Sequence, residues 1–146
     1  MEKREPVLSM RDLAVSFQAS FGKIRAVRGV NMDVYPGETV AIVGESGSGK
    51  SVSVKTIMGI TAPNAVIESG TIKFRFKENG KEQVVDLLKL SKKEMQHRIK
   101  GKRIAMVFQD PMTSLDPTMT IGSQLPEGMR YHLHLSQAVA DKRAEE

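Results

Sequence analysis

The first part of the chain alternates apolar and polar side chains in a pattern typical of antiparallel strands. Apolar side chains recur at about every second position over residues 7–17 and 30–34, so each segment should form a half-buried strand. Three more apolar residues alternate with charged ones over 72–77, and Asn79 and Gly80 then offer a tight turn toward residues 84–87. We therefore expect an antiparallel sheet that includes a hairpin.

Two short, mostly apolar runs predict strands of another kind. Residues 39–43 follow a turn at 35–38 and lead into a glycine-rich loop, whereas residues 104–108 lead into a loop rich in Asp, Pro, Ser and Thr. Such runs are typical of strands that are buried on both faces of a parallel sheet. Together with the helical patterns between them, they predict an α/β fold.

Helical spacing follows the glycine-rich loop. Apolar residues recur at that spacing over 54–58, and Gly59 stands where the helix should end. Residues 91–94 read S-K-K-E, the pattern of a capping box that opens a short helix with Met95 and Ile99 on one face. We expect a helix after the loop and another after residue 91.

The last part of the chain is helical in pattern but interrupted. Beyond residue 121, Pro126 and Gly128 are both unfavourable inside a helix. Residues 136–146 form a weak, alanine-containing helical pattern. We therefore expect short helices here rather than one continuous helix.

Composition narrows the class of protein. The 146 residues are 40% hydrophobic and 27% charged, as in one globular domain, and no apolar run approaches the roughly 18–20 residues that cross a bilayer. There is no cysteine, which excludes disulfides and thiolate metal sites, and the charged N-terminus does not resemble a secretory signal. A cytosolic domain is expected. The net charge of +5 is read as a solvated basic face, and a nucleic-acid-binding domain has only this charge in its favour.

One motif carries specific chemistry. Residues 44–51 fit the phosphate-binding loop G-x-x-x-x-G-K-[ST] at every fixed position and stand between a predicted strand and a predicted helix. Glycines let backbone N–H groups turn toward phosphate oxygens, the lysine reaches the β- and γ-phosphates, and the final hydroxyl ligates Mg²⁺. The predicted nucleotide-binding residues are Gly44, Glu45, Ser46, Gly47, Ser48, Gly49, Lys50 and Ser51.

The base is predicted to be adenine. Neither N-K-x-D nor D-x-x-G occurs, so a GTPase would lack guanine recognition and its usual switch residue. A small-molecule kinase stays open, although the further arginines expected near an acceptor site are not recognisable in the sequence.

The segments VGESGSGKS (43–51), MVFQDPMTSLDPTMTIGSQ (106–124) and AVRGVNMDVYPGE (26–38) resemble the ATP-binding subunits of oligopeptide and dipeptide ABC importers. The segment QDPMTSLDP (109–117) is typical of the peptide and nickel importer branch. The resemblance covers nearly the whole chain. It implies a partial phosphate-loop ATPase core with an antiparallel β-subdomain and the start of a helical subdomain, so that residues 1–146 would form the N-terminal portion of a nucleotide-binding domain.

The same resemblance implies roles for individual residues. Gln109 would be the glutamine that touches Mg²⁺ or the attacking water, with Ser51 as the second metal ligand, and the cofactors would be ATP and Mg²⁺. Phe17 falls where the family places an aromatic ring that stacks on adenine, with Phe21 as the alternative. His97, His132 and His134 are read as surface residues.

The family's partners are also implied. They are transmembrane permease subunits, a second ATP-binding subunit in a dimer and, indirectly, an extracytoplasmic peptide-binding protein, but no nucleic acid. The complete protein would lie at the cytoplasmic side of the cell membrane as a peripheral subunit that energises import of peptides, or of nickel.

Three elements of the family pattern do not occur in these residues: an LSGGQ signature, an apolar strand ending in Asp-Glu, and a switch histidine. Leu135, Ser136 and Gln137 resemble the signature only faintly, because its two glycines are missing. Without the acidic pair the chain should lack the carboxylate that positions water. The alternative to a transporter ATPase is therefore a non-hydrolysing nucleotide-binding fragment or decayed gene product.

Overall fold

The structure is a computed structural model that describes residues 4–108 and 115–145. The chain divides into two units, Met1–Met95 and Gln96–Glu146. Gln109, the predicted metal-contacting glutamine, lies outside the described residues.

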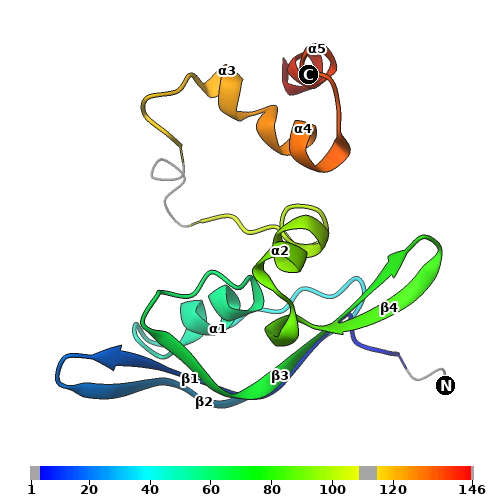
Figure 1. Ribbon diagram of the computed structural model, residues 1–146. Helices are drawn as coiled ribbons and strands as arrows, with labels where there is room; N and C mark the ends of the chain where they lie inside the picture. Colours follow the sequence, from blue (N-terminus) through cyan, green and yellow to red (C-terminus); the bar gives the residue numbers. More distant parts are fainter. Residues whose placement is uncertain (1–3, 109–114, 146) are drawn as a thin grey trace. The chain divides into compact units, whose positions relative to one another are not determined.

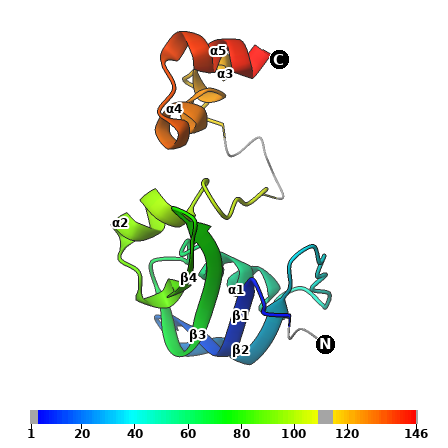
Figure 2. The same cartoon turned by 90° about the vertical axis from the view of Figure 1, so that its right-hand side faces the viewer.

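The first unit is built on a four-stranded antiparallel sheet in the order β2-β1-β3-β4. The strands are β1 (Leu8–Ala19), β2 (Gly22–Val34), β3 (Ala65–Glu78) and β4 (Lys81–Asp86), and the first three lie side by side in Figure 2. Asn79 and Gly80 link β3 to β4 with φ of 51° and 76°, the left-handed values that a two-residue hairpin turn needs. The predicted antiparallel region and its hairpin are confirmed.

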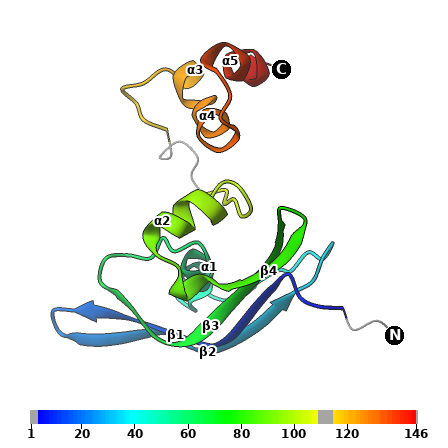
Figure 3. The same cartoon turned by 45° about the vertical axis from the view of Figure 1, so that its right-hand side comes forward.

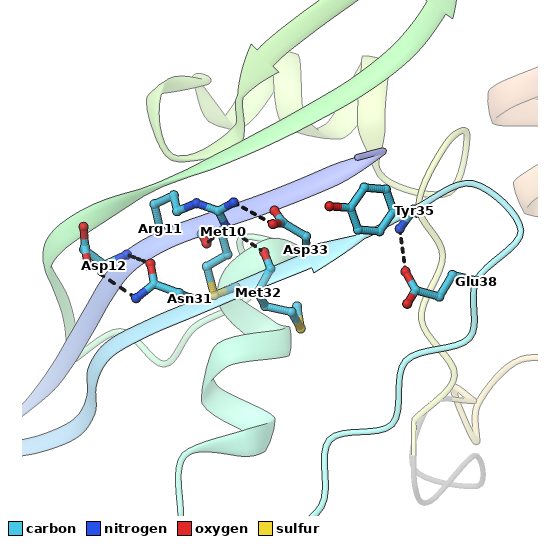
Figure 4. A network of polar contacts seen from close by, with 8 residues as sticks. All are labelled: Met10, Arg11, Asp12, Asn31, Met32, Asp33, Tyr35 and Glu38. Atoms are coloured by element: carbon cyan, nitrogen blue, oxygen red, sulfur yellow. Dashed lines mark hydrogen bonds and ion pairs between the residues drawn. The ribbon is translucent and has the colours of Figure 1, made fainter. Parts of the chain in front are cut away.

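A bulge at Asp12 interrupts the pairing of β1 with β2 between Met10 and Leu13. Asp12 adopts a positive φ of 49°, and its backbone N–H donates to Oδ1 of Asn31 at 2.9 Å. Beside the bulge, Arg11 Nη2 lies 2.6 Å from Asp33 Oδ2 (Figure 4). These side chains hold the two strands in register where the regular ladder is broken.

Helix α1 (Lys50–Ile57) covers one side of this sheet, on the inner side of its bend (Figures 1 and 3). The helix ends at Gly59, as predicted: the φ of Gly59 is 59°, and the N–H of Ile60 bonds back to the carbonyl of Lys55 at 3.0 Å. The buried apolar residues of the unit are Leu8, Met10, Leu13, Val15, Val27, Ile57, Met58, Ile72, Phe74, Leu87 and Met95.

The two predicted parallel strands are wrong for the described structure. Residues 39–43 have no strand structure, and 104–108 contribute one isolated bridge between Lys100 and Ile104. Residues 39–43 are exposed, with Val43 at 87%, and in the second run Ile104 and Met106 are half-buried while Val107 is 93% exposed. A strand buried on both faces needs hydrogen-bonding neighbours, and within residues 4–108 and 115–145 no strand lies beside either run.

The remaining elements are short helices. A 3₁₀ turn (η1, Leu87–Lys89) precedes α2 (Lys92–Glu94), which continues into a π turn (η2, Met95–Ile99). The capping box is confirmed: Glu94 N–H donates to Ser91 Oγ at 3.3 Å, and Ser91 N–H donates to Glu94 Oε2 at 2.9 Å. Met95 and Ile99 are both buried, as expected.

The second unit contains α3 (Ile121–Gln124), α4 (Glu127–Leu133) and α5 (Gln137–Glu145). Pro126 stands at the start of α4, where its missing N–H costs nothing, and its carbonyl accepts from Arg130 N–H at 3.0 Å. The predicted interruption is confirmed at Pro126, whereas at Gly128 it is wrong, because Gly128 lies inside α4. In the described part of the chain, no helix is both long enough and apolar enough to cross a membrane.

Candidate phosphate-binding site

The glycine-rich loop curls through backbone conformations that favour glycine. Gly44, Gly47 and Gly49 have φ of 153°, 80° and 90°. Side chains with a Cβ rarely adopt such values, so the sequence permits this curl only where it places glycines. The N–H of Ser48 bonds to the carbonyl of Glu45 at 3.3 Å and closes the turn. The loop therefore has a defined shape that its glycines allow.

Gly49 joins the loop to α1 and lies against the sheet. A Cβ at Gly49 would stand 2.5 Å from the carbonyl oxygen of Ala26 and 3.4 Å from Cγ2 of Val27, both in β2. Only a residue without a side chain permits this approach. The start of α1 is thus seated on β2, and the loop is fixed relative to the antiparallel sheet.

The ammonium of Lys50 is folded back over the loop. Its Nζ donates to the carbonyls of Gly44 at 2.7 Å and Glu45 at 2.5 Å, and it lies 3.2 Å from Ser48 Oγ. These contacts hold a positive charge above the curled backbone rather than in free solution. A second source of positive potential lies at the same place, because α1 begins there.

The N-terminal end of α1 is prepared for an anion. This described helix has no acidic residue in its first turn and no side-chain hydrogen bond to its cap. Ser53 and Thr56 instead bond backward, to the carbonyls of Gly49 at 3.0 Å and Val52 at 2.7 Å. The first backbone N–H groups are thus left for a ligand, which suits phosphate oxygens.

Ser51 is the candidate ligand for a divalent cation in the loop. Ser51 is exposed at the start of α1, and its hydroxyl is an oxygen donor of the type that Mg²⁺ prefers. No group of three or more His, Asp or Glu side chains that could hold a metal occurs in residues 4–108 and 115–145. The residues therefore fit Mg²⁺ that takes most of its ligands from phosphates and water.

The two candidate aromatic residues occupy different positions. Phe17 is half-buried in β1, paired with Ile24 of β2 and Ala65 of β3, whereas Phe21 lies in the β1–β2 turn and is 81% exposed. Ile24 is two residues from Ala26, whose carbonyl meets Gly49. The structure thus places Phe17 on the strand beside the one that seats the phosphate loop.

A polar cluster next to Phe17 was not predicted from the sequence. Ser16 is fully buried, its Oγ donates to Glu68 Oε1 at 2.5 Å, and Lys23 Nζ lies 2.7 Å from the same oxygen. The hydrogen bond from Lys23 contributes most, and that from Ser16 second most, to holding the pKa of Glu68 below its usual value. The residues are far apart in sequence, and only the strand register brings them together.

Two histidines of the second unit, His97 and His132, form aromatic contacts with Tyr131. His97 Nδ1 lies 3.1 Å from the Tyr131 hydroxyl, and the two rings are stacked with centroids 5.8 Å apart. His132 meets the edge of Tyr131 at a centroid distance of 4.9 Å, and His134 ends α4 with a φ of 55°.

Comparison with known proteins identifies the family. Residues 27–146 match the ABC transporter family. The dipeptide transport ATP-binding protein DppD of Bacillus subtilis is 49% identical over 139 residues, which are 94% of this chain and 39% of DppD. The DppD protein of Lactococcus lactis is 47% identical over 141 residues, which are 96% of this chain and 38% of that protein.

A solved structure shares the fold. The ATP-binding cassette MJ0796, solved as a dimer in a post-hydrolysis state with ADP and Pi, matches with a TM-score of 0.70 at 21% identity, over 94% of this chain and 54% of that one. The fold is therefore the α/β fold of an ABC ATPase, present in part. The chain spans less than two fifths of the length of both DppD relatives. From the match over residues 27–146 and the identity to these relatives, the chain belongs to the ABC transporter family.

Proposed function

We propose that residues 1–146 are the N-terminal portion of the nucleotide-binding domain of a peptide-importing ABC transporter, and that they bind MgATP at the loop over residues 44–51. The observation that carries this proposal is the position of Lys50. Its ammonium is held over a curled glycine loop at the start of a helix that has no acidic residue in its first turn. This is a site for a multiply charged phosphate chain.

Each part of the loop has its own role. The N–H groups of Gly47, Gly49, Lys50 and Ser51 donate to phosphate oxygens, while Glu45 and Ser46 shape the turn, which the Ser48 N–H closes. Lys50 exchanges its loop carbonyls for the β- and γ-phosphates, which offer stronger, charge-assisted hydrogen bonds. The Ser51 hydroxyl serves as a ligand of Mg²⁺, and Gln109 is proposed as the second protein contact of the metal.

The adenine is proposed to stack on Phe17. Phe17 is only half-buried, so part of its ring can receive a ligand, and its strand neighbours the point where the phosphate loop meets β2. Stacking needs a flat π-face and no hydrogen-bonding group, which phenylalanine provides. Phe21 is the alternative, although its position in the turn gives it less support.

The transport role rests on the relatives. DppD of B. subtilis and of L. lactis are named for dipeptide transport, and OppD of B. subtilis, 48% identical over 141 residues, for oligopeptide transport. We propose that the complete protein hydrolyses ATP to energise peptide import at the cytoplasmic face of the membrane. Its proposed partners are permease subunits and a second ATP-binding subunit, with an extracytoplasmic peptide-binding protein acting indirectly; nickel is the alternative cargo.

A titration with a fluorescent ATP analogue and Mg²⁺ tests the nucleotide site. Lys50→Ala should weaken binding about ten- to a hundredfold, because hydrogen bonds to charged groups contribute roughly 1.5–3 kcal/mol. Lys55→Ala is the matched control, since Lys55 is an exposed lysine in the last turn of the same helix. Equal affinities in the wild type and both variants would exclude this loop as the binding site.

A further inference from the structure

Phe17 is flanked along β1 by two residues that are both tied to neighbouring strands or loops. Ser16 precedes it and is bonded to Glu68 of β3, and Gln18 follows it and is bonded to Asn64, just before β3. Phe17 itself carries an apolar ring on a strand whose pairing with β2 shifts in register between Val15 and Ser16. Side-chain contacts therefore fix the backbone where the ladder alone is irregular.

The contact before Phe17 joins all three neighbouring strands. Ser16 of β1 and Lys23 of β2 meet the same oxygen, Oε1 of Glu68 in β3, at 2.5 Å and 2.7 Å. Glu68 and Lys23 are about one third and two fifths exposed at their side chains, whereas Ser16 is fully buried. An exposed ion pair by itself contributes little, but removing Glu68 would also deprive the buried Ser16 hydroxyl of its acceptor.

The contact after Phe17 involves the backbone N–H and carbonyl of Gln18. The N–H of Gln18 donates to the carbonyl of Asn64 at 2.9 Å, and Asn64 Nδ2 donates to the carbonyl of Gln18 at 2.9 Å. This pair fixes one side of Phe17 without involving Glu68. Substitutions of Ser16, Lys23 or Glu68 should therefore make the backbone at Phe17 more mobile, while the bonds between Gln18 and Asn64 keep this part of β1 beside β3.

We propose that Glu68 is a positioning residue for adenine: together with Ser16 and Lys23 it forms a three-strand clamp that holds Phe17 where the base stacks. This inference rests on the proposed nucleotide site. A ring that is already ordered loses less conformational freedom when a ligand stacks on it, so the clamp raises affinity for the base without touching it. The clamp should leave the phosphate contacts of the loop unchanged, because none of its three residues belongs to that loop.

The experiment compares two ligands. MgATP and inorganic triphosphate compete with a fluorescent ATP analogue for the wild type, Glu68→Ala, Ser16→Ala and Phe17→Ala. Phe17→Ala should weaken ATP binding by about as much as the loss of one stacked base. Glu68→Ala should cause only part of that loss, about three- to tenfold. Inorganic triphosphate, which has no base, should change by less than about twofold in both variants. Glu68→Gln, which keeps an acceptor for Ser16, should recover part of the loss.

Two comparisons separate positioning from a general structural effect. Glu68→Ala in the Phe17→Ala background should cause no further loss of ATP affinity, because a clamp without its ring has nothing to position. Asp33→Ala removes another side-chain contact between β1 and β2, with Arg11, and should leave both ligands unaffected. If Glu68→Ala folds poorly, Lys23→Ala repeats the test by removing an exposed member of the clamp.

Three results would overturn the clamp. The first is that Glu68→Ala weakens the binding of ATP and of triphosphate equally. The second is that Glu68→Ala weakens ATP binding as much in the Phe17→Ala background as it does in the wild type. The third is an unchanged ATP affinity in Glu68→Ala while Phe17→Ala weakens binding, which leaves the stacking assignment intact. An unchanged ATP affinity in Phe17→Ala would reject the stacking assignment and the clamp together, whereas an unchanged affinity in Lys50→Ala would reject the nucleotide site itself.

Discussion

Gly49 lies so close to Ala26 that a Cβ at Gly49 would stand 2.5 Å from the Ala26 carbonyl oxygen. One glycine of the phosphate-loop motif thus serves two purposes. Its φ of 90° lets the loop turn into α1, and its missing side chain lets α1 sit on β2. The phosphate loop and the sheet that carries Phe17 are joined at this contact.

Gly49→Ala should disrupt the loop more than Gly47→Ala does. Both residues have positive φ, which costs about 1–2 kcal/mol for a residue with a Cβ. At Gly49 the Ala26 backbone must also move, whereas a Cβ at Gly47 meets no described atom within 4 Å. The measurement is MgATP affinity together with thermal unfolding. Similar losses in the two variants would show that close packing against β2 is not what the loop requires of Gly49.

Phe17→Ala should weaken adenine nucleotide binding by about 1–3 kcal/mol, the range found for bases stacked on aromatic side chains. Phe21→Ala is the matched variant, because it removes the same ring from the exposed turn that follows β1. Competition by ATP against the fluorescent analogue provides the comparison. A loss in Phe21→Ala with none in Phe17→Ala would move the base to the turn.

The elements that the sequence predicted correctly are determined by local interactions. The turn at Asn79 and Gly80, the capping box of Ser91 and Glu94, and the helix end at Gly59 each depend on residues a few positions apart. The apolar runs 39–43 and 104–108 are different, since a buried strand exists only beside other strands. Their composition fits such an environment, but the described residues do not provide it.

The same difference between local and long-range interactions applies to the candidate site. The phosphate loop is contiguous in sequence, so spacing alone could name its eight residues. The cluster beside Phe17 joins positions 16, 23 and 68, and a buried serine in a strand gives no sequence signal of its own. The bulge at Asp12 and the register shifts of β1 decide which side chains meet, and neither can be read from alternation.

The pKa of Asp33 should lie below that of an ordinary aspartate, because the hydrogen bond from the Arg11 guanidinium favours its charged form. Arg11→Gln should raise this pKa toward its usual value, which an NMR titration of the carboxyl carbon would measure. A folded-state pKa that is lowered means that the pair stabilises the fold above the ordinary carboxyl pKa. That contribution is lost as the pH falls through the lowered value. An unchanged titration in Arg11→Gln would contradict the ion pair.

Val107→Lys should reduce self-association of residues 1–146. Val107 is 93% exposed and belongs to the apolar run 104–108, whose composition favours a strand. Exposed apolar segments of this kind tend to pair with other chains. Val139→Lys is the control, because Val139 is a 51% exposed valine within helix α5. Sedimentation velocity at several concentrations gives the mass distribution. Association that persists in Val107→Lys but disappears in Val139→Lys would place the contact elsewhere.

Purified residues 1–146 should bind MgATP without turning it over. Phosphoryl transfer to water needs a carboxylate that orients the attacking water and groups that close over the γ-phosphate. The sequence contains no apolar run of four residues followed by Asp-Glu and no LSGGQ, and Lys50 and the loop backbone supply binding but no base.

Phosphate release by the wild type should therefore be no faster than by Lys50→Ala, measured with excess MgATP in a coupled phosphate assay. Binding must be shown in the same preparation, so that a lack of release is not a lack of ligand. Steady release that Lys50→Ala abolishes, from a monomer with a cooperative thermal transition, would mean that a catalytic carboxylate lies among residues 1–146. The exposed Glu45, whose backbone carbonyl accepts from Lys50 Nζ, would then be the first residue to replace, because it is the only carboxylate within the loop over residues 44–51.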